Sequence, residues 1–380
     1  MSEFRQGFVA AIRAVFQDPS AVATLIGAVV LYSFYYPVAY SHQNASSLPV
    51  VVVDLDQGNL SRHLIRELPA VRALKVVGHP ANIGEAERVI AAGRAEGIVV
   101  VEHDFQRKIL RGQPGEIALL ADGAFLGRAN TVLQGAADAI GAVAQRAARQ
   151  RAQFSGPPGT APFTLVQRPL FNTREGYGSA IVPGVGVLIV QQTLLIGIGG
   201  LAGTRRERSG RLSYAPLRLL GLLASFWVLG FINLIYYAGF VAWFQDFPRG
   251  GNAVGSLLEA ALFIGAVVAF GAFIGSFFDK RERAVQIVLV TAMPFYFLAN
   301  LSWPLTSTPT LITWAAKLVP TTPGITASVK LNQIGASIAE TAPELANLAV
   351  LVLLYGALAF WRYREPRTQT PASERGRAEA

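Results

Sequence analysis

The chain of 380 residues contains no cysteine, which excludes disulfides, thiolate metal sites and cysteine nucleophiles. Charged residues make up only 15% of it, against roughly 25% in ordinary soluble domains, whereas hydrophobic residues make up 52%. No phosphate-binding loop of the form GxxxxGK[ST] occurs anywhere in the sequence. The small charged fraction and the large hydrophobic fraction exclude an ordinary soluble protein and indicate an integral membrane protein.

Catalytic and metal-binding patterns are also missing. The four histidines lie without metal-ligand spacing, so no metal site is expected; they are His42, His63, His79 and His103. The segment from Gly335 to Ala339 lacks the second glycine and the preceding strand of a nucleophile elbow. The formal net charge of +9 does not indicate a nucleic-acid partner, because the excess lies in short segments beside apolar runs. We therefore expect a protein without a catalytic residue of its own.

Residues 181–211 organise the rest of the chain. Up to Gly203 the stretch has no charged residue and is long enough to cross a hydrocarbon core of roughly 30 Å as a helix. It then meets Arg205, Arg206, Glu207 and Arg208. Short loops rich in Lys and Arg stay on the cytoplasmic side, so this span is expected to enter from outside. A large segment must then lie outside before it.

Apolar and polar runs divide the chain into six expected transmembrane helices and their connections. We predict an amphipathic interfacial helix over residues 1–20, because Phe4, Phe8, Ile12 and Phe16 recur at helical spacing. The first apolar run is interpreted as an uncleaved anchor rather than a signal peptide, because it is long enough to span a bilayer. The expected spans are residues 21–41, 179–203, 217–245, 254–278, 284–303 and 344–362. Between and after them lie a cytoplasmic loop at 204–216, an outer segment at 304–343 and a cytoplasmic tail at 363–380. The outer segment is expected to be re-entrant or interfacial and to form short helices.

Residues 42–178 have a different character. LPVVVVDLD, from Leu48, is typical of a buried strand, and further strands are predicted at 75–78, 97–102 and 116–121. Helices are predicted between them at 60–68, 83–92 and 105–110, followed by a long Ala-rich helix at 125–154. Alternation of strands and helices favours a small α/β domain. The fold class expected is thus an α-helical integral membrane protein with an inserted α/β extracytoplasmic domain.

The distribution of basic residues supports this topology. Fifteen of the 33 Lys and Arg residues fall in the segments assigned to the cytoplasm, and only three fall in the short outer loops, namely Arg249, Lys317 and Lys330. The remainder lie in the large insertion, which is long enough to escape the positive-inside rule. Both termini are therefore expected inside.

The expected spans contain few polar residues. Ionisable groups deep in a bilayer mark proton relays or ion paths, and here Glu259, near the outer end of its span, is the nearest candidate. A proton-driven carrier is therefore not favoured. Candidates to line a translocation path are Gln191, Gln192, Asn233, Glu259 and Asn300. For the two glutamines and Asn233 the alternative is hydrogen bonding between packed helices, and for Glu259 it is stabilisation by a helix N-terminus.

Two pairs of glycines are spaced as GxxxG within the expected spans. They are Gly199 with Gly203 and Gly271 with Gly275. Small residues at this spacing let helices approach closely in membranes, so we expect all four glycines at helix–helix contacts.

Four stretches give the chain a specific resemblance. They are VVVDLDQGNLSRHLIREL from Val51, VPGVGVLIVQQTLLIGIGGLAGTRRERSG from Val182, LSWPLTSTP with LVPTTPGI from Leu301, and LNQIGAS from Leu331. With the layout of spans, they resemble the permease subunits of ABC-2 type transporters, in particular the bacterial branch with a large extracytoplasmic domain between the first two spans. The resemblance covers essentially the whole chain.

This resemblance implies a half-transporter in the bacterial inner membrane. It would pair with itself or a sister permease and be served by a separate cytoplasmic ATPase, which binds ATP and Mg, so that this chain needs no cofactor. The ATPase would contact the helix from Phe4 to Phe16 and a coupling segment; by the likeness, that segment is Arg205, Arg206, Glu207, Arg208, Ser209 and Gly210. The serine and glycine after RER depart from the ending more common in the family. A periplasmic adaptor and an outer-membrane channel are further partners that the branch commonly uses.

Two functions are open at this point. The favoured one is an ATP-driven exporter of a hydrophobic or amphiphilic substrate, with the path at a dimer interface lined by the second and fifth spans. The alternative is a membrane-anchored extracytoplasmic sensor or assembly scaffold that transports nothing. Six spans with an apolar outer segment favour the exporter.

Overall fold

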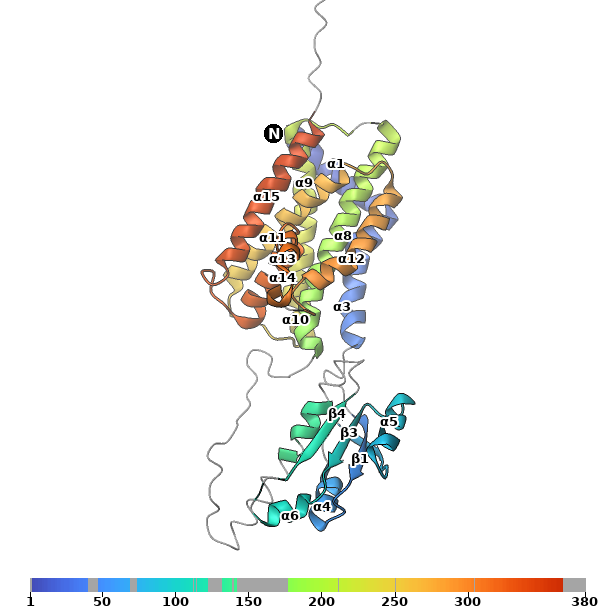
Figure 1. Ribbon diagram of the computed structural model, residues 1–380. Coiled ribbons are helices and arrows are strands. Elements are labelled where there is room, and N and C mark those ends of the chain that lie inside the picture. Colours follow the sequence, from blue (N-terminus) through green and yellow to red (C-terminus); the bar gives the residue numbers. More distant parts are fainter. Residues whose placement is uncertain are drawn as a thin grey trace, which may run out of the picture. The chain divides into compact units, whose positions relative to one another are not determined.

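The protein is described by a computed structural model in which the chain divides into two compact units, shown in Figure 1. Met1–Ser41 and Pro169–Ala380 form the first unit, and His42–Arg168 form the second. The structure describes residues 2–39, 47–68, 74–111, 113, 115–121, 132–138, 140–141, 177–210, 212–249, 251–303 and 305–364. Most of the helix predicted at 125–154, and the connection from 155 to 176, lie outside these residues.

The second unit is built on a four-stranded sheet in the order β2-β1-β3-β4. β1 (Leu48–Asp54) is parallel to β2 (Leu74–Gly78) and β3 (Gly97–Val101), and β4 (Ile117–Ala121) is antiparallel to β3. The valines of β1 are buried alternately in two cores, one on each face of the sheet. Helices separate the strands along the chain; they are α4 (Asn59–Glu67), α5 (Ile83–Ala91) and α6 (Phe105–Leu110).

The first unit is helical, and five of its described helical segments are long and apolar enough to cross a membrane. They are Pro19–Val38, Gly178–Ser209, Pro216–Phe244, Ala253–Gly275 and Ala342–Tyr363. The first comprises α2 (Pro19–Val22), the π-helical segment η1 (Ala23–Gly27) and most of α3 (Ala28–Ala39). The others contain α8 (Tyr177–Ser209), α9 (Pro216–Ile235) with η3 (Tyr236–Val241) and α10 (Ala242–Phe244), α11 (Ala253–Gly275) and α15 (Ala342–Tyr363).

The fifth span expected from the sequence, residues 284–303, is shorter in the structure. The corresponding helix, α12 (Arg281–Leu298), has 18 residues and begins with Arg281, Glu282 and Arg283. About 15 residues then remain for an apolar core that needs about 20. Among the described residues the structure thus provides five helices that are long and apolar enough, rather than six.

The N-terminal helix α1 (Ser2–Phe16) packs on α9 through its smallest side chains. Its buried residues are Gly7, Ala11 and Val15. A Cβ added to Gly7 would meet the carbonyl oxygen of Arg218, and one added to Gly221 would meet the carbonyl oxygen of Phe4. Both approaches are closer than any real Cβ contact, so only glycine fits at either position. Two of the phenylalanines of α1 are exposed, Phe4 by 36% and Phe16 by 57%.

The chain between α12 and α15 folds into short helices, as expected for 304–343. They are η4 (Leu305–Ser307), α13 (Thr310–Lys317), α14 (Thr321–Ser328) and the π-helical segment η5 (Val329–Ile334). α14 is inserted among the longer helices, since Thr321 to Ile325 are all buried. Lys330 bonds to Glu344 at 2.6 Å, which joins η5 to the start of α15.

Candidate functional site

Several helix ends of the first unit meet at one end of it, where the N-terminus also lies (Figure 1). The Arg206 guanidinium of α8 donates a 2.8 Å hydrogen bond to the carbonyl of Ser276, just after α11. The Tyr214 amide, before α9, donates to the Tyr363 carbonyl at the end of α15 at 3.0 Å. Basic segments of the sequence lie beside the residues that these two contacts join. We therefore call this end of the first unit the basic end.

The segment expected as a loop from residue 204 is helical as far as Ser209. α8 continues without interruption through the charged residues, and the Ser209 hydroxyl donates to the Arg205 carbonyl at 2.7 Å. Gly210 then adopts φ +68°, the left-handed conformation that commonly terminates a helix. The prediction of a loop over 204–209 was wrong, because Arg and Glu are good helix formers and glycine comes only after them.

The predicted coupling residues divide into two groups. Arg205 lies 4.5 Å above the ring of Tyr214, and Arg206 bonds to Ser276, so both face neighbouring segments. Glu207 and Arg208 are exposed. A partner protein at the basic end would therefore meet this second pair first.

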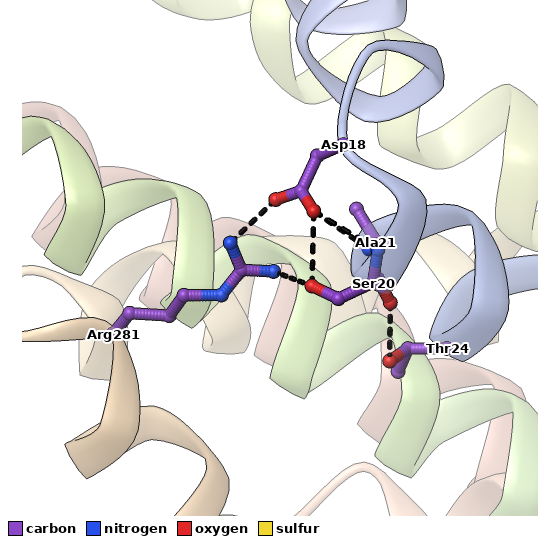
Figure 2. A network of polar contacts seen from close by, with 5 residues as sticks. All are labelled: Asp18, Ser20, Ala21, Thr24 and Arg281. Atoms are coloured by element: carbon purple, nitrogen blue, oxygen red, sulfur yellow. Dashed lines mark hydrogen bonds and ion pairs between the residues drawn. The ribbon is translucent and has the colours of Figure 1, made fainter.

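A polar network that the sequence did not single out joins the start of the first apolar segment to α12 (Figure 2). One carboxylate oxygen of Asp18 accepts from the Ser20 amide at 3.0 Å and caps α2, and the other pairs with Arg281 at 2.5 Å. Arg281 also donates to the Ser20 hydroxyl. The Arg281 guanidinium, helped by the hydrogen bonds from Ser20 and Ala21 and opposed by burial, lowers the pKa of Asp18 to about 2.

Replacing Asp18 with asparagine is expected to remove this ion pair while keeping the oxygen that caps α2. Because the pKa of Asp18 is depressed on folding, the pair stabilises the protein above the ordinary pKa of 3.8, and the stabilisation is lost as the pH falls towards 2. Both side chains are about one-third exposed, so we expect a loss of about 0.5 to 1 kcal/mol at pH 7. Thermal unfolding of detergent-solubilised protein at pH 7 and pH 2.5 measures it.

Asp279→Asn is the matched control. Asp279 forms an ion pair with Arg283, four residues later at the start of α12, so this pair is local and does not join distant segments. That change should shift the unfolding temperature less than Asp18→Asn. An Asp18→Asn variant whose deficit is the same at both pH values would contradict the assigned role of the charge.

Beside this network lies a cavity of about 700 Å³ between the N-terminal segment, α8 and α12. Asp18, Ser20 and Thr24 line it from the N-terminal segment, and Thr204 and Arg208 line it from α8. Gln17 and Arg281 also line it, and apolar residues such as Ile196, Leu201 and Val285 form most of the remaining wall. A cavity lined by both apolar side chains and charged groups suits an amphiphilic molecule, and we call it the amphiphile cavity.

Three of the predicted path residues hold helices together. Gln191 is fully buried and donates to the Thr321 hydroxyl of α14 at 2.6 Å. Gln192 is turned towards α12, where its amide lies 3.5 Å from the Val288 carbonyl. Asn233 donates to the Leu25 carbonyl in η1 at 2.8 Å. Packing accounts for these bonds, although the side-chain oxygens of both glutamines are buried without a partner among the described residues.

The other two path candidates lie apart from these. Glu259 is 3% exposed in α11, and its Oε1 has no hydrogen-bond partner among the described residues. Asn300 is exposed, adopts φ +61°, and accepts a 3.0 Å bond from the Leu305 amide. Asn300 therefore stabilises the turn after α12, and the structure does not bring the five candidates together in one cavity.

The GxxxG glycines lie at close helix contacts. A Cβ on Gly203 would lie 2.5 Å from the Lys280 carbonyl, and one on Gly199 would lie 2.9 Å from the Ala284 Cβ. A Cβ on Gly275 would be 3.4 Å from the Gly199 Cα, and one on Gly271 would be 3.1 Å from Leu195. The glycines therefore lie at helix contacts, as their spacing predicts, and the structure shows that the helices concerned are α8, α11 and α12.

No group of three or more His, Cys, Asp or Glu side chains that could hold a metal ion occurs among the residues that the structure describes.

Known proteins resemble the chain over most of its length. A family model described as "ABC-2 family transporter protein" matches residues 20–361. The linearmycin resistance permease protein LnrN of Bacillus subtilis (strain 168) is 20% identical over 371 residues, which cover 91% of this chain and 94% of that protein. The inner membrane transport permease YhhJ of Escherichia coli (strain K12) is 22% identical over 360 residues, covering 91% and 92%.

Proposed function

The chain belongs to the ABC-2 transporter family, and from this premise we propose that it is the permease subunit of an exporter driven by a separate ATPase. Membership makes it a multi-pass transmembrane transporter subunit without catalytic activity of its own, and permeases of this family work with a cytoplasmic ATPase subunit. Export from the cytoplasm or inner leaflet, a hydrophobic or amphiphilic substrate, and ATP and Mg bound by the partner are our further proposals.

The observation that carries this proposal is the basic end. Arg206 of α8, Arg281 of α12 and Arg362 of α15 lie there, together with α1, although they are far apart in the sequence. Short basic segments remain in the cytoplasm. A cytoplasmic ATPase would therefore meet the exposed Glu207 and Arg208 on the membrane side where ATP is available.

The proposed arrangement has six crossings, with α12 as the fifth. Its short apolar part would cross beside the buried helix α14, which contacts it. Residues 42–178 would then lie outside the cytoplasm, with both termini inside. The amphiphile cavity lies beside α8 and α12, the two spans proposed to line the path. A second permease would complete the path, and a periplasmic adaptor and outer-membrane channel would extend it.

Co-purification with the cognate ATPase tests the function. We expect the ATPase to be retained by tagged permease, and its hydrolysis of ATP to rise in proteoliposomes that contain both subunits. The sensor or scaffold function would instead be supported if the permease retained no ATPase and its second unit bound an extracytoplasmic protein.

The orientation has its own test, which the absence of cysteine makes simple because any introduced thiol is unique. In spheroplasts, a membrane-impermeant maleimide is expected to label Glu87→Cys, on the exposed face of α5, without permeabilisation. Arg208→Cys should be labelled only after permeabilisation. Labelling of Arg208→Cys in intact spheroplasts would reverse the proposed topology.

A further inference from the structure

A second cavity at the basic end is distinct from the amphiphile cavity. It has a volume of about 410 Å³ and lies between the ends of α8, α11 and α15. Arg206, Arg362 and Arg364 line it, together with Ser213, Ser276 and Leu212. None of its described lining residues is acidic. Three guanidinium groups around one space make a site for an anion.

The walls of this arginine cavity are fixed by buried aromatic residues. Tyr214 and Tyr363 are 6% and 4% exposed, their ring centroids are 5.7 Å apart, and their backbones share the 3.0 Å hydrogen bond. Tyr363 also donates its hydroxyl to the Ala272 carbonyl at 3.1 Å. Since Ser213 precedes Tyr214, and two of the arginines flank Tyr363, these contacts set the positions of the polar lining.

The helix ends use only part of the positive charge. A helix C-terminus carries about half a negative charge. Arg206 compensates this charge at the end of α11 by its hydrogen bond to the Ser276 carbonyl. Arg362 instead lies 4.9 Å from the ring of Phe277, and Arg364 follows α15 in an extended conformation. Arg364 has no hydrogen bond or ion pair to another described residue. Neither Arg362 nor Arg364 forms an ion pair with an acidic side chain of the described residues, so both guanidinium groups can contact a ligand.

We propose that this cavity binds the phosphate group of an anionic phospholipid from the leaflet at the basic end. The aromatic residues around it favour a lipid over a protein carboxylate. Phe277 and Trp361 adjoin the lining and are 55% and 68% exposed. Exposed aromatic side chains beside arginines are typical of the depth of lipid headgroups, and basic pockets between transmembrane helices bind such headgroups. Lipid chains would cover the aromatic rings while the phosphate reached the arginines.

Native mass spectrometry of the full-length protein in nonionic detergent tests this proposal. Titration with phosphatidylglycerol should reveal one site that binds it more tightly than phosphatidylcholine. Each arginine near an anionic surface changes affinity about 5-fold, so Arg364→Gln should weaken phosphatidylglycerol binding by about that factor. Arg362→Gln combined with Arg364→Gln should weaken it roughly 25-fold. The single variant changes an exposed side chain and keeps the test valid if the double variant does not fold.

The matched control is Arg283→Gln, which removes an arginine from the same end but outside the cavity, where it pairs with Asp279. It should leave phosphatidylglycerol binding unchanged. Equal affinity for the two lipids, or an equal loss in the control, would overturn the proposal. So would displacement of the lipid by equimolar inorganic phosphate, which would identify a free-phosphate site. Loss of the ATPase from Arg364→Gln with unchanged lipid binding would instead identify a protein contact. These lipid-binding measurements do not depend on transport, so they test the lipid site even if the proposed export function is wrong.

Discussion

Glu207→Lys is expected to weaken association with the ATPase by at least about 30-fold, which corresponds to about 2 kcal/mol or more. Glu207 is exposed at the end of α8 and is the acidic residue among Arg205, Arg206 and Arg208. A basic group of the partner that pairs with it would meet a like charge in the variant. The measurement is the apparent Kd of the detergent-solubilised subunits at fixed ionic strength, because salt screens exposed charges.

Glu282→Lys is the matched control. Glu282 is also an exposed acid at the basic end, but it lies on α12, outside the proposed contact. It should keep near-normal affinity, and both variants should unfold at the wild-type temperature, because neither side chain is buried. If Glu207→Lys binds the ATPase as well as Glu282→Lys does, the docking role of α8 is wrong.

Gly221→Ala is expected to destabilise the protein by about 1 to 3 kcal/mol. The added methyl group would collide with the carbonyl oxygen of Phe4, and backbone atoms cannot rotate away as a side chain can. α1 would have to separate from α9, which would also expose Ala11 and Val15. Unfolding in detergent measures the loss of stability, and faster hydrogen exchange in α1 would show where it arises.

The same substitution at Gly356 should act in the opposite direction. Gly356 is in α15 and has no atom within 4 Å of an added Cβ. Alanine there lowers the entropy of the unfolded chain, so Gly356→Ala should stabilise the protein by about 0.5 to 1 kcal/mol. Equal effects at both glycines would show that helix propensity, rather than the close contact of α1 with α9, controls the result.

Much of the local structure follows from patterns along the chain. The apolar runs gave the positions of the long helices, and short runs rich in valine gave β1 and β3, because burial on both faces leaves little room for polar residues. The sequence also anticipated short helices between α12 and α15. The aromatic face of α1 was identified, but its contact with α9 was not, because that contact depends on two glycines 214 residues apart, Gly7 and Gly221.

The candidate site was less predictable. Arg281 and Asp18 are separated by 263 residues, and nothing local to either indicates the other. Arg362 and Arg364 were interpreted only as orientation signals, and Arg206 also as a coupling residue. The cavity that they line was not predicted, since a sequence does not show that the ends of α8, α11 and α15 enclose a space. Asn300 was selected for its polarity, but its positive φ assigns it to a turn. Long-range packing decides each of these cases.

The uninterrupted course of α8 has a mechanical consequence. With 33 residues and a rise of 1.5 Å per residue, it is about 50 Å long, well beyond the roughly 30 Å of a hydrocarbon core. Pro183 interrupts the hydrogen bonding of the first turns of α8, so the part that can act as a rigid rod is the stretch after it, about 39 Å long. A partner that tilted this stretch at its arginine-rich tip by only about 5° would displace its other end by about 3 Å. A small stroke at one membrane face would thus become a larger opening at the other.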